Sequence, residues 1–267
     1  MINPSIFGYH WDNYLYGQKV MFIFACFRKN PLNNQTLPIV KFLKWAAIVL
    51  VSVLVIIFAA IKIFSKSLPE GKTGPVAEAL ADKMLQAVNA EGYDQLTYLE
   101  WTFRDDHHFA WNKKDNQVIV KWEGYVVHLS PDDLTGTATK NGVALVGDTE
   151  QEALQTAWSY FANDSFWLVA PYKIRDPGTQ RSLVETDEGP ALLITYTSGG
   201  VTPGDSYLWY LDKTGRPVAW EMWTSIIPIQ GMRITWDDWV AHKGAWFAPD
   251  HQGPGPITIP LTIHRIE

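Results

Sequence analysis

The hydrophobic pattern of the chain is dominated by a long apolar run from Trp45 to Phe64. The first seventeen residues of this run, between Lys44 and Lys62, carry no charge. A helix rises about 1.5 Å per residue, so twenty residues span roughly 30 Å, the thickness of the hydrocarbon core of a bilayer. Lysines stand at both ends, where their long side chains reach the headgroups. We therefore predict a transmembrane helix over residues 41–66, preceded by an N-terminal tail at residues 1–40.

After this run the pattern changes to that of an α+β domain. Residues 67–75 contain several Gly and Pro and are predicted to be a linker. Over residues 75–91 apolar side chains recur every three or four positions, which predicts an amphipathic helix. From residue 96 onward, short runs of alternating apolar and polar side chains are separated by Gly, Asn and Asp. This pattern predicts antiparallel strands joined by turns.

A second helix is predicted over residues 149–163. Thr149 and Glu152 have the spacing of a capping box, and the apolar positions after them fall on one helix face. Residues 166–179 then combine aromatic side chains with Pro171 and read as a loop. Two interpretations of residues 164–176 are open, a lid or pocket rim, or a strand edge held by aromatic side chains.

The predicted elements determine the expected fold class. The domain has about ten to twelve short strands and two helices, and a sheet of that many strands must curl to cover its own apolar face. We predict an α+β fold over residues 76–267: a curved antiparallel β-sheet, or half-barrel, with the two helices on its concave side.

Charge divides sharply at the apolar run. Residues 1–68 carry seven Lys and Arg against one acid, a net charge of +6, and the remaining residues carry a net charge of −12. An acidic domain argues against nucleic acid as a partner, since phosphate binding depends on clustered basic groups. Within about twenty residues of the run, four basic residues precede it and three follow it, which favours a cytoplasmic N-terminus. We expect a single-pass protein of the cell membrane with its C-terminal domain in the periplasm.

The sequence offers little catalytic chemistry. It contains no HExxH motif, no paired cysteines, no G-x-S-x-G elbow and no Gly-rich phosphate loop between a strand and a helix. His107 and His108 are adjacent on a predicted strand and therefore point to opposite faces, which argues against a shared metal ion. The single cysteine, Cys26, precedes the apolar run, so the domain is expected to fold without disulfides. We predict neither enzyme activity nor a metal or cofactor.

Tryptophan is the most unusual feature of the composition. Eleven of the thirteen tryptophans fall in the C-terminal domain. They indicate either a large aromatic core or an apolar cavity that holds a lipid-like chain. Under the second interpretation, the candidate ligand-binding residues are Trp101, Trp122, Trp158, Trp167, Tyr172, Trp209, Trp220 and Trp236.

Two segments carry a family resemblance, residues 158–176 (WSYFANDSFWLVAPYKIRD) and residues 196–209 (YTSGGVTPGDSYLW). With the order of the predicted elements, they resemble the bacterial lipoprotein-carrier superfamily. That superfamily includes periplasmic lipoprotein carriers, the outer-membrane receptor for lipoproteins and a periplasmic regulator of envelope stress signalling. The resemblance covers roughly residues 75–267 and is one of layout. It implies a half-barrel whose apolar concave face receives acyl chains or a partner segment. Soluble carriers shuttle, whereas this chain is tethered by its own predicted helix, which argues against a shuttle role.

Three hypotheses about function follow. The leading one is a membrane-anchored domain that binds a lipid or lipidated ligand in an apolar concavity and acts in envelope biogenesis or sensing. The first alternative is a structural or sensory module whose sheet contacts another envelope protein. The second is an anchored hydrolase, which requires a cluster of Asp, Glu, His or Ser in one pocket.

Overall fold

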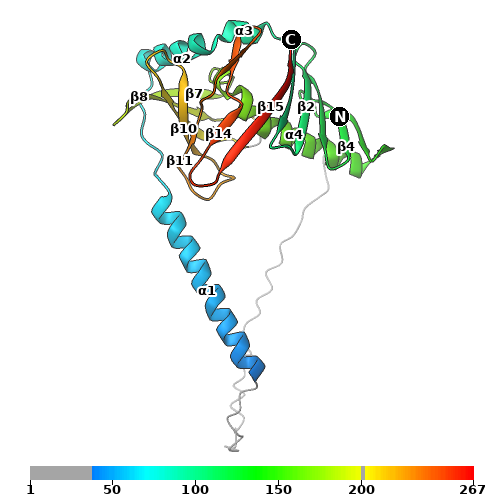
Figure 1. Cartoon of the computed structure of the whole chain (residues 1–267), viewed down its shortest axis with the longest axis vertical. Coiled ribbons are helices and arrows are strands. Elements are labelled where there is room, and N and C mark those ends of the chain that lie inside the picture. Colours follow the sequence, from blue (N-terminus) through cyan, green and yellow to red (C-terminus); the bar gives the residue numbers. More distant parts are fainter. Residues whose placement is uncertain (1–37, 200–201) are drawn as a thin grey trace, which may run out of the picture. The chain divides into compact units, whose positions relative to one another are not determined.

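The computed structural model describes residues 38–199 and 202–267, drawn in colour in Figure 1. Its first element is helix α1 (Pro38–Phe64). Within it, Val40–Phe64 is long and apolar enough to cross a membrane, and none of its most apolar stretch is buried. This agrees with the predicted membrane span. The predicted tail lies outside the described residues as far as residue 37.

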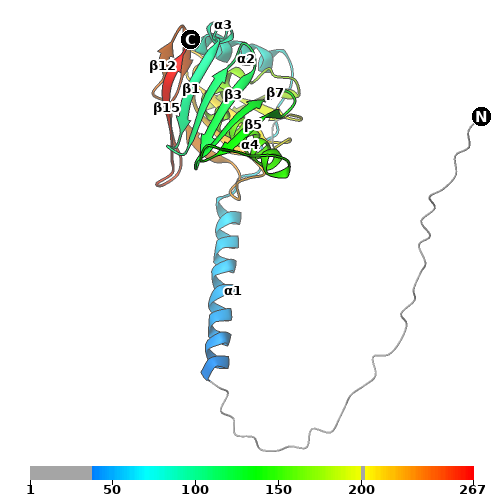
Figure 2. The ribbon, with the colours of Figure 1, turned by 90° about the vertical axis from the view of Figure 1, so that its right-hand side faces the viewer.

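The C-terminal domain contains one large antiparallel sheet. Its eight strands follow the order β14-β15-β1-β2-β3-β4-β5-β6, and Figure 2 shows its central strands side by side as one twisted layer. The strands are β1 (Tyr98–Phe103), β2 (His107–Asn112), β3 (Gln117–Trp122), β4 (Tyr125–Ser130), β5 (Thr135–Lys140), β6 (Val143–Ala144), β14 (Asp250–Gln252) and β15 (Thr258–Ile266).

A second antiparallel sheet has five strands in the order β11-β10-β9-β8-β7. They are β7 (Thr179–Thr186), β8 (Gly189–Tyr196), β9 (Ser206–Leu211), β10 (Pro217–Trp223) and β11 (Met232–Thr235), and a separate hairpin is formed by β12 (Val240–His242) and β13 (Ala245–Phe247). The predicted α+β class with open antiparallel sheets is confirmed. The predicted strand number was too low, since the described residues form fifteen strands, and they form two sheets and a hairpin where one sheet was expected.

The two sheets meet through side chains at the edge strands β14 and β11. The buried ring of His251 on β14 has Nδ1 3.0 Å from the carbonyl oxygen of Thr235 on β11. Its Nε2 lies 2.8 Å from the carbonyl oxygen of Trp167. The amide of Gln252 also donates to the Thr235 hydroxyl at 3.0 Å. Because these edge strands are only three and four residues long, a side-chain junction replaces a continuous ladder.

Helix α2 (Pro75–Val88) begins where it was predicted, with Pro75 in its first turn, where a missing amide costs nothing. It ends three residues earlier than expected, because Asn89 adopts a left-handed conformation with φ of 55°. The short helix α3 (Ala90–Asp94) follows. Helix α2 buries Ala81 and Met84 against the apolar side chains of the second sheet.

Helix α4 (Asp148–Val169) is longer than predicted. The expected capping box does not form, since the helix starts at Asp148 after Gly147 and the Thr149 hydroxyl donates to the carbonyl of Val146. At the other end, the segment expected to be a loop remains helical to Val169 and continues as a 3-10 turn, η1 (Ala170–Tyr172). The apolar side chains there are buried in the core, and this burial outweighs the local loop signals.

Two apolar clusters make up the interior. The first lies between the large sheet and the buried face of α4 and includes Trp101 and Phe109, whose rings stack 4.9 Å apart. The second lies between the second sheet, α2 and η1. It contains a tryptophan triad, Trp209, Trp220 and Trp236, whose ring centroids are 4.8 to 5.0 Å apart. Helices α2 and α4 therefore cover one face of the sheets, as predicted.

The outer face of the second sheet carries a third apolar cluster, which includes Leu208 and Trp223. The segment between α1 and α2 is hydrogen-bonded to this region. Lys72 and Leu183 exchange both backbone hydrogen bonds at 2.8 Å. The ammonium group of Lys66 lies 2.5 Å from a carboxylate oxygen of the buried Glu221. The indole of Trp223 donates to the Lys66 carbonyl at 2.9 Å. This segment is therefore docked along part of its length.

We expect Gly71→Val to detach the docked segment, because a Cβ at this position lies 2.5 Å from the Cβ of Ser182. Overpacking of this kind reduces the free energy of unfolding by about 1–3 kcal/mol. Urea unfolding of the full chain in detergent measures the loss, and limited proteolysis at residues 65–74 detects the detachment. Ser67→Val, at an exposed position in the same segment, is the control. Equal stability of the two variants contradicts the docking.

We also expect the junction at His251 to weaken in acid. Burial lowers the pKa of His251, and the carbonyl groups of Thr235 and Trp167 offset this only in part. Below about pH 6.5, where an unperturbed imidazole titrates, the unfolded chain therefore binds a proton that the folded chain excludes. The free energy of unfolding thus falls as the pH falls from about 6.5 toward the pKa of the folded state.

The non-titrating variant His251→Gln should lose part of this slope when urea unfolding is compared at about pH 7.5 and about pH 5. The exposed His128 provides the matched control, His128→Gln. Identical slopes for wild type and His251→Gln argue against this role of the histidine.

Candidate functional site

A pocket of about 380 Å³ lies between helix α4 and the connections at one end of both sheets. In an antiparallel meander, alternate turns fall at the same end. The β2–β3 and β4–β5 turns therefore meet the α4 side of this pocket, and the β8–β9 and β10–β11 loops meet its other side. The lining comprises Trp111, Asn116, Pro131, Asp132, Trp158, Phe161, Ala162, Asn163, Ser165, Phe166, Val169, Lys173, Asp176, Pro177, Tyr196, Ser198, Gly199, Thr202, Asp205, Tyr207 and Ile226.

Helix α4 supplies the apolar wall. Phe161 contacts Trp111 edge to face at 5.3 Å and Trp158 at 6.4 Å. One and a half turns later, Phe166 contacts Tyr196 at 5.3 Å and Tyr207 at 5.0 Å. The aromatic groups thus form a continuous surface from the large sheet to the second sheet.

The register of β8 and β9 places two polar groups at the second sheet's end of the pocket. Ile194 pairs with Tyr207 on the inner face, and Thr195 pairs with Ser206 on the outer face. One step further, the amide of Tyr196 donates to the carbonyl of Asp205 at 2.9 Å. Since facing residues of an antiparallel pair project to the same side, Tyr196 and Asp205 both project inward.

These two side chains are only partly satisfied. Asp205 is 95% buried, since its relative exposure is 5%. One of its carboxylate oxygens accepts from the amide of Ser225 at 3.1 Å. The other oxygen, and the buried hydroxyl of Tyr196, have no hydrogen-bond partner among residues 38–199 and 202–267. Buried polar groups normally have hydrogen-bond partners, so these two groups make this end of the pocket a candidate site for a polar part of a ligand.

Burial also raises the pKa of both tyrosines that face Asp205. The pKa of Tyr196 lies well above its ordinary value through burial, with Tyr207 adding to the effect. The pKa of Tyr207 is raised by burial and by the Asp205 charge. Both hydroxyls therefore keep their protons at neutral pH and can donate hydrogen bonds.

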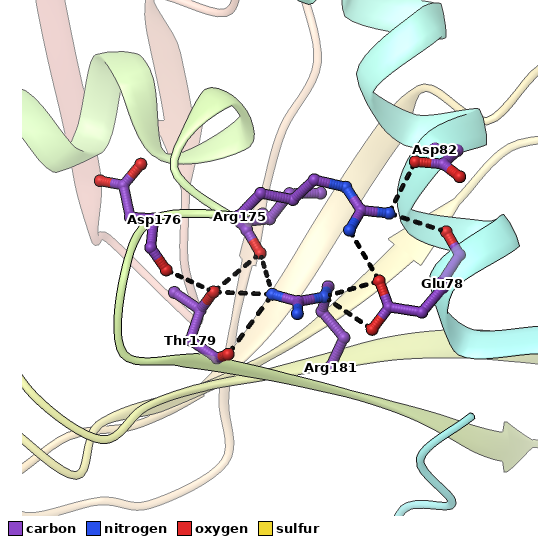
Figure 3. A network of polar contacts seen from close by, with 7 residues as sticks. Glu78, Asp82, Arg175, Asp176, Thr179 and Arg181 are labelled. Carbon is purple, nitrogen blue, oxygen red and sulfur yellow. Dashed lines mark hydrogen bonds and ion pairs between the residues drawn. The ribbon is translucent and has the colours of Figure 1, made fainter. Parts of the chain in front are cut away.

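The wall at residues 173–177 is held by an ion-pair network that Figure 3 shows. Glu78 of α2 accepts from Arg175 at 2.7 Å, and its two carboxylate oxygens share the Nε–H of Arg181 at 2.9 Å each. Arg181 also donates to the Ile174 carbonyl at 3.0 Å, and Arg175 reaches Asp82 at 2.6 Å. Burial opposes it, but the two guanidinium groups hold the pKa of Glu78 below its ordinary value. The network ties the pocket wall to α2.

The sequence-predicted binding residues are distributed unevenly around this pocket. Trp158 lines it. The tryptophan triad, Trp209, Trp220 and Trp236, is fully buried, as is Trp101, and the four indole N–H groups have no partner in the described part of the chain. The other three candidates belong to or pack against the interior, Trp122 by stacking on Tyr125, Trp167 by contacting Trp220 and Tyr172 by stacking on Tyr93. Ligand contact by any of the eight stays a prediction.

Tyr196, Asp205, Tyr207 and Phe166 were not among the predicted site residues, although all four lie in the two segments that carried the family resemblance. The signal available in the sequence was the polar loop at residues 197–205 between two apolar strands. Its position opposite α4 depends on the pairing of β8 with β9 and on the length of α4. Neither was predicted.

A second polar cluster lies outside the pocket lining. His107 contacts Asp164 of α4 at 2.6 Å and stacks on Tyr160, and burial raises the pKa of Asp164 in spite of the histidine. His108 projects to the opposite face, as strand alternation predicts, and lies 3.2 Å from Glu100. Within the described residues, no three His, Cys, Asp or Glu side chains are grouped so that they would hold a metal ion.

Comparison with known proteins yields distant structural likeness and no match in sequence. No family model matches the chain, and no curated protein matches it. Among solved structures, a DUF1329 family protein from Desulfovibrio piger is similar with a TM-score of 0.38 and 11% sequence identity, over 73% of this chain and 93% of that chain. We draw no conclusion about function from this likeness, and the resemblance to the lipoprotein-carrier superfamily stays a prediction.

We expect Arg181→Ala to loosen the pocket wall, because it removes the hydrogen bond that Nε shares between the two Glu78 oxygens and the bond to the Ile174 carbonyl. The loss of hydrogen bonds from this largely buried guanidinium should reduce the free energy of unfolding by about 1–3 kcal/mol. Hydrogen exchange at residues 173–179 should accelerate. Arg265→Ala, which removes an exposed ion pair with Glu267, should leave the free energy of unfolding nearly unchanged, because water screens exposed pairs. If both variants change stability and hydrogen exchange to the same extent, Arg181 does not hold the pocket wall.

Proposed function

We propose that the C-terminal domain is a non-catalytic, membrane-anchored module that binds part of an amphiphilic molecule in the pocket beside α4. The observation that carries this proposal is the lining itself. It combines an aromatic wall with a small number of polar groups at one end, which is the usual composition of a small-molecule site.

The size of the pocket limits what enters it. A volume of about 380 Å³ is near the lower end for ligand sites. It accommodates about a dozen water-sized groups. A two-chain phospholipid has far more atoms than that. We therefore infer that one portion of the ligand, a headgroup or a segment of one chain, occupies the pocket while the rest stays outside.

The anchor makes an amphiphile a reasonable ligand. Helix α1 is long and apolar enough to span a bilayer, and attachment to it would keep the domain at the membrane. Tethering raises the effective concentration of a membrane-derived ligand without adding a contact. The four basic residues before the uncharged residues 45–61, against three after them, favour a cytoplasmic N-terminus, so we propose that the domain acts in the periplasm.

The chemistry of the lining favours binding over catalysis. Among the described residues that line the pocket there is no histidine, and the His107–Asp164 pair lies outside the lining. The hydrolase hypothesis needs a nucleophile and a base together at one pocket. Among the described lining residues, no serine is hydrogen-bonded to an Asp or Lys side chain of the lining, and the proposal therefore includes no reaction.

Filling the pocket tests the proposal. We expect Ala162→Trp to reduce the affinity for a single-chain phospholipid at least about tenfold, because the new indole occupies space beside Phe161 and Phe166. The fold should survive, since Ala162 is only partly buried. Isothermal titration calorimetry of the full chain in maltoside detergent measures the affinity.

The matched control is Ser159→Trp, which places the same side chain on the exposed face of the same helix. It should bind the probe as the wild type does. Equal affinity of both variants would show that the ligand binds elsewhere. Failure of the wild type to bind any amphiphile, together with a discrete protein adduct in cellular crosslinking, would favour the protein-interaction alternative.

A further inference from the structure

The polar end of the pocket restricts the chemistry of its ligand. Asp205 is 95% buried, from its 5% relative exposure, and has one carboxylate oxygen without a partner among the described residues. The neighbouring Tyr196 hydroxyl is likewise buried and unpartnered there. The two side chains project inward from facing positions, because the amide of Tyr196 donates to the carbonyl of Asp205. Both residues line the pocket, so a ligand that fills this end meets both of them.

An acyl chain is the wrong group for this end. A hydrocarbon segment beside Asp205 would leave the carboxylate oxygen desolvated and unpaired, which is strongly unfavourable. A phosphate or carboxylate beside it would add like-charge repulsion. A group that donates hydrogen bonds and carries positive charge satisfies the oxygen with a strong, charge-assisted bond.

The surroundings are suited to such a cation. Phe166, Tyr196 and Tyr207 contact one another with centroid distances of 5.0 to 5.8 Å, and aromatic faces attract ammonium groups. The hydroxyl of Tyr196 keeps its proton and donates, so it requires an acceptor oxygen close to the cation. Lys173 also lines the pocket and pairs with Asp176 at 3.2 Å, and its ammonium has further N–H groups for a phosphoryl oxygen.

Building on the proposed function, we infer that the pocket binds the headgroup of its amphiphile, and that this headgroup carries a primary ammonium next to a phosphoryl group. The ammonium donates to Asp205, and a phosphoryl oxygen accepts from Tyr196 and faces Lys173. The acyl chain leaves along the aromatic wall of α4 past Phe161 and Trp158. Phosphoethanolamine lipids have this chemistry, and so does free phosphoethanolamine.

The test compares four probes on the full-length wild type by isothermal titration calorimetry in maltoside detergent. Three are single-chain phospholipids with the same acyl chain and an ethanolamine, choline or glycerol headgroup. The fourth is phosphoethanolamine without a chain. Choline keeps the charge but has no N–H to donate, and glycerol has no charge. We expect the ethanolamine lipid to bind about 10- to 100-fold more tightly than the other two lipids, the range for a hydrogen bond to a charged group.

Two variants assign the preference to these residues. Asp205→Asn keeps the acceptor for the Ser225 amide and removes the charge, so it should bind all three lipids with the affinity that the wild type has for the glycerol lipid. Tyr196→Phe should weaken the ethanolamine lipid about fivefold, the effect of one neutral hydrogen bond. The control is Asp187→Asn, at an exposed carboxylate outside the pocket lining, which should leave the headgroup preference intact.

The outcomes separate this inference from the proposed function. Equal binding of the three lipids by the wild type overturns the headgroup assignment and leaves amphiphile binding standing. Absence of binding to every probe overturns both. If phosphoethanolamine alone binds as tightly as the lipid, the headgroup chemistry holds and the ligand is a soluble molecule, which overturns amphiphile binding. The wild-type comparison decides the headgroup assignment even if Asp205→Asn does not fold.

Discussion

Helix α4 packs against both sheets at once, and this double packing determines where the domain is solid and where it is open. The first half of the helix buries Ala153, Leu154 and Ala157 in the cluster under the large sheet. Its last turns reach the second sheet, where Phe166 contacts Tyr207, and the edge of the large sheet, where the carbonyl of Trp167 lies beside His251 of β14. Between these contacts a single helix does not fill the space at the loop end of the sheets, and the pocket occupies it.

The tryptophans correctly indicated an aromatic interior but did not indicate where the pocket lies. Their number predicted an unusual apolar interior, and the interior is indeed rich in stacked indoles. Three of them pair with each other to close the middle of the second sheet. The open space lies instead at the strand ends, where Tyr196 and Asp205 project inward. Composition cannot distinguish the middle of the sheet from the strand ends, since both locations depend on long-range strand pairing.

Local patterns predicted other parts of the domain well. Strand alternation correctly predicted that His107 and His108 point to opposite faces of the sheet. Boundaries failed where tertiary contacts compete with local preference. Phe166 to Val169 carries loop signals but is helical because both clusters bury it, and the break between the two sheets depends on edge strands too short to form a ladder.

A structure of the full chain bound to a single-chain phosphatidylethanolamine tests the central claim most directly. The account predicts the headgroup between α4 and the ends of β8 and β9, with its ammonium at Asp205 and its chain along the aromatic wall. Ligand on the outer face of either sheet, or a chain inserted beside Asp205 with the headgroup outside, would contradict it.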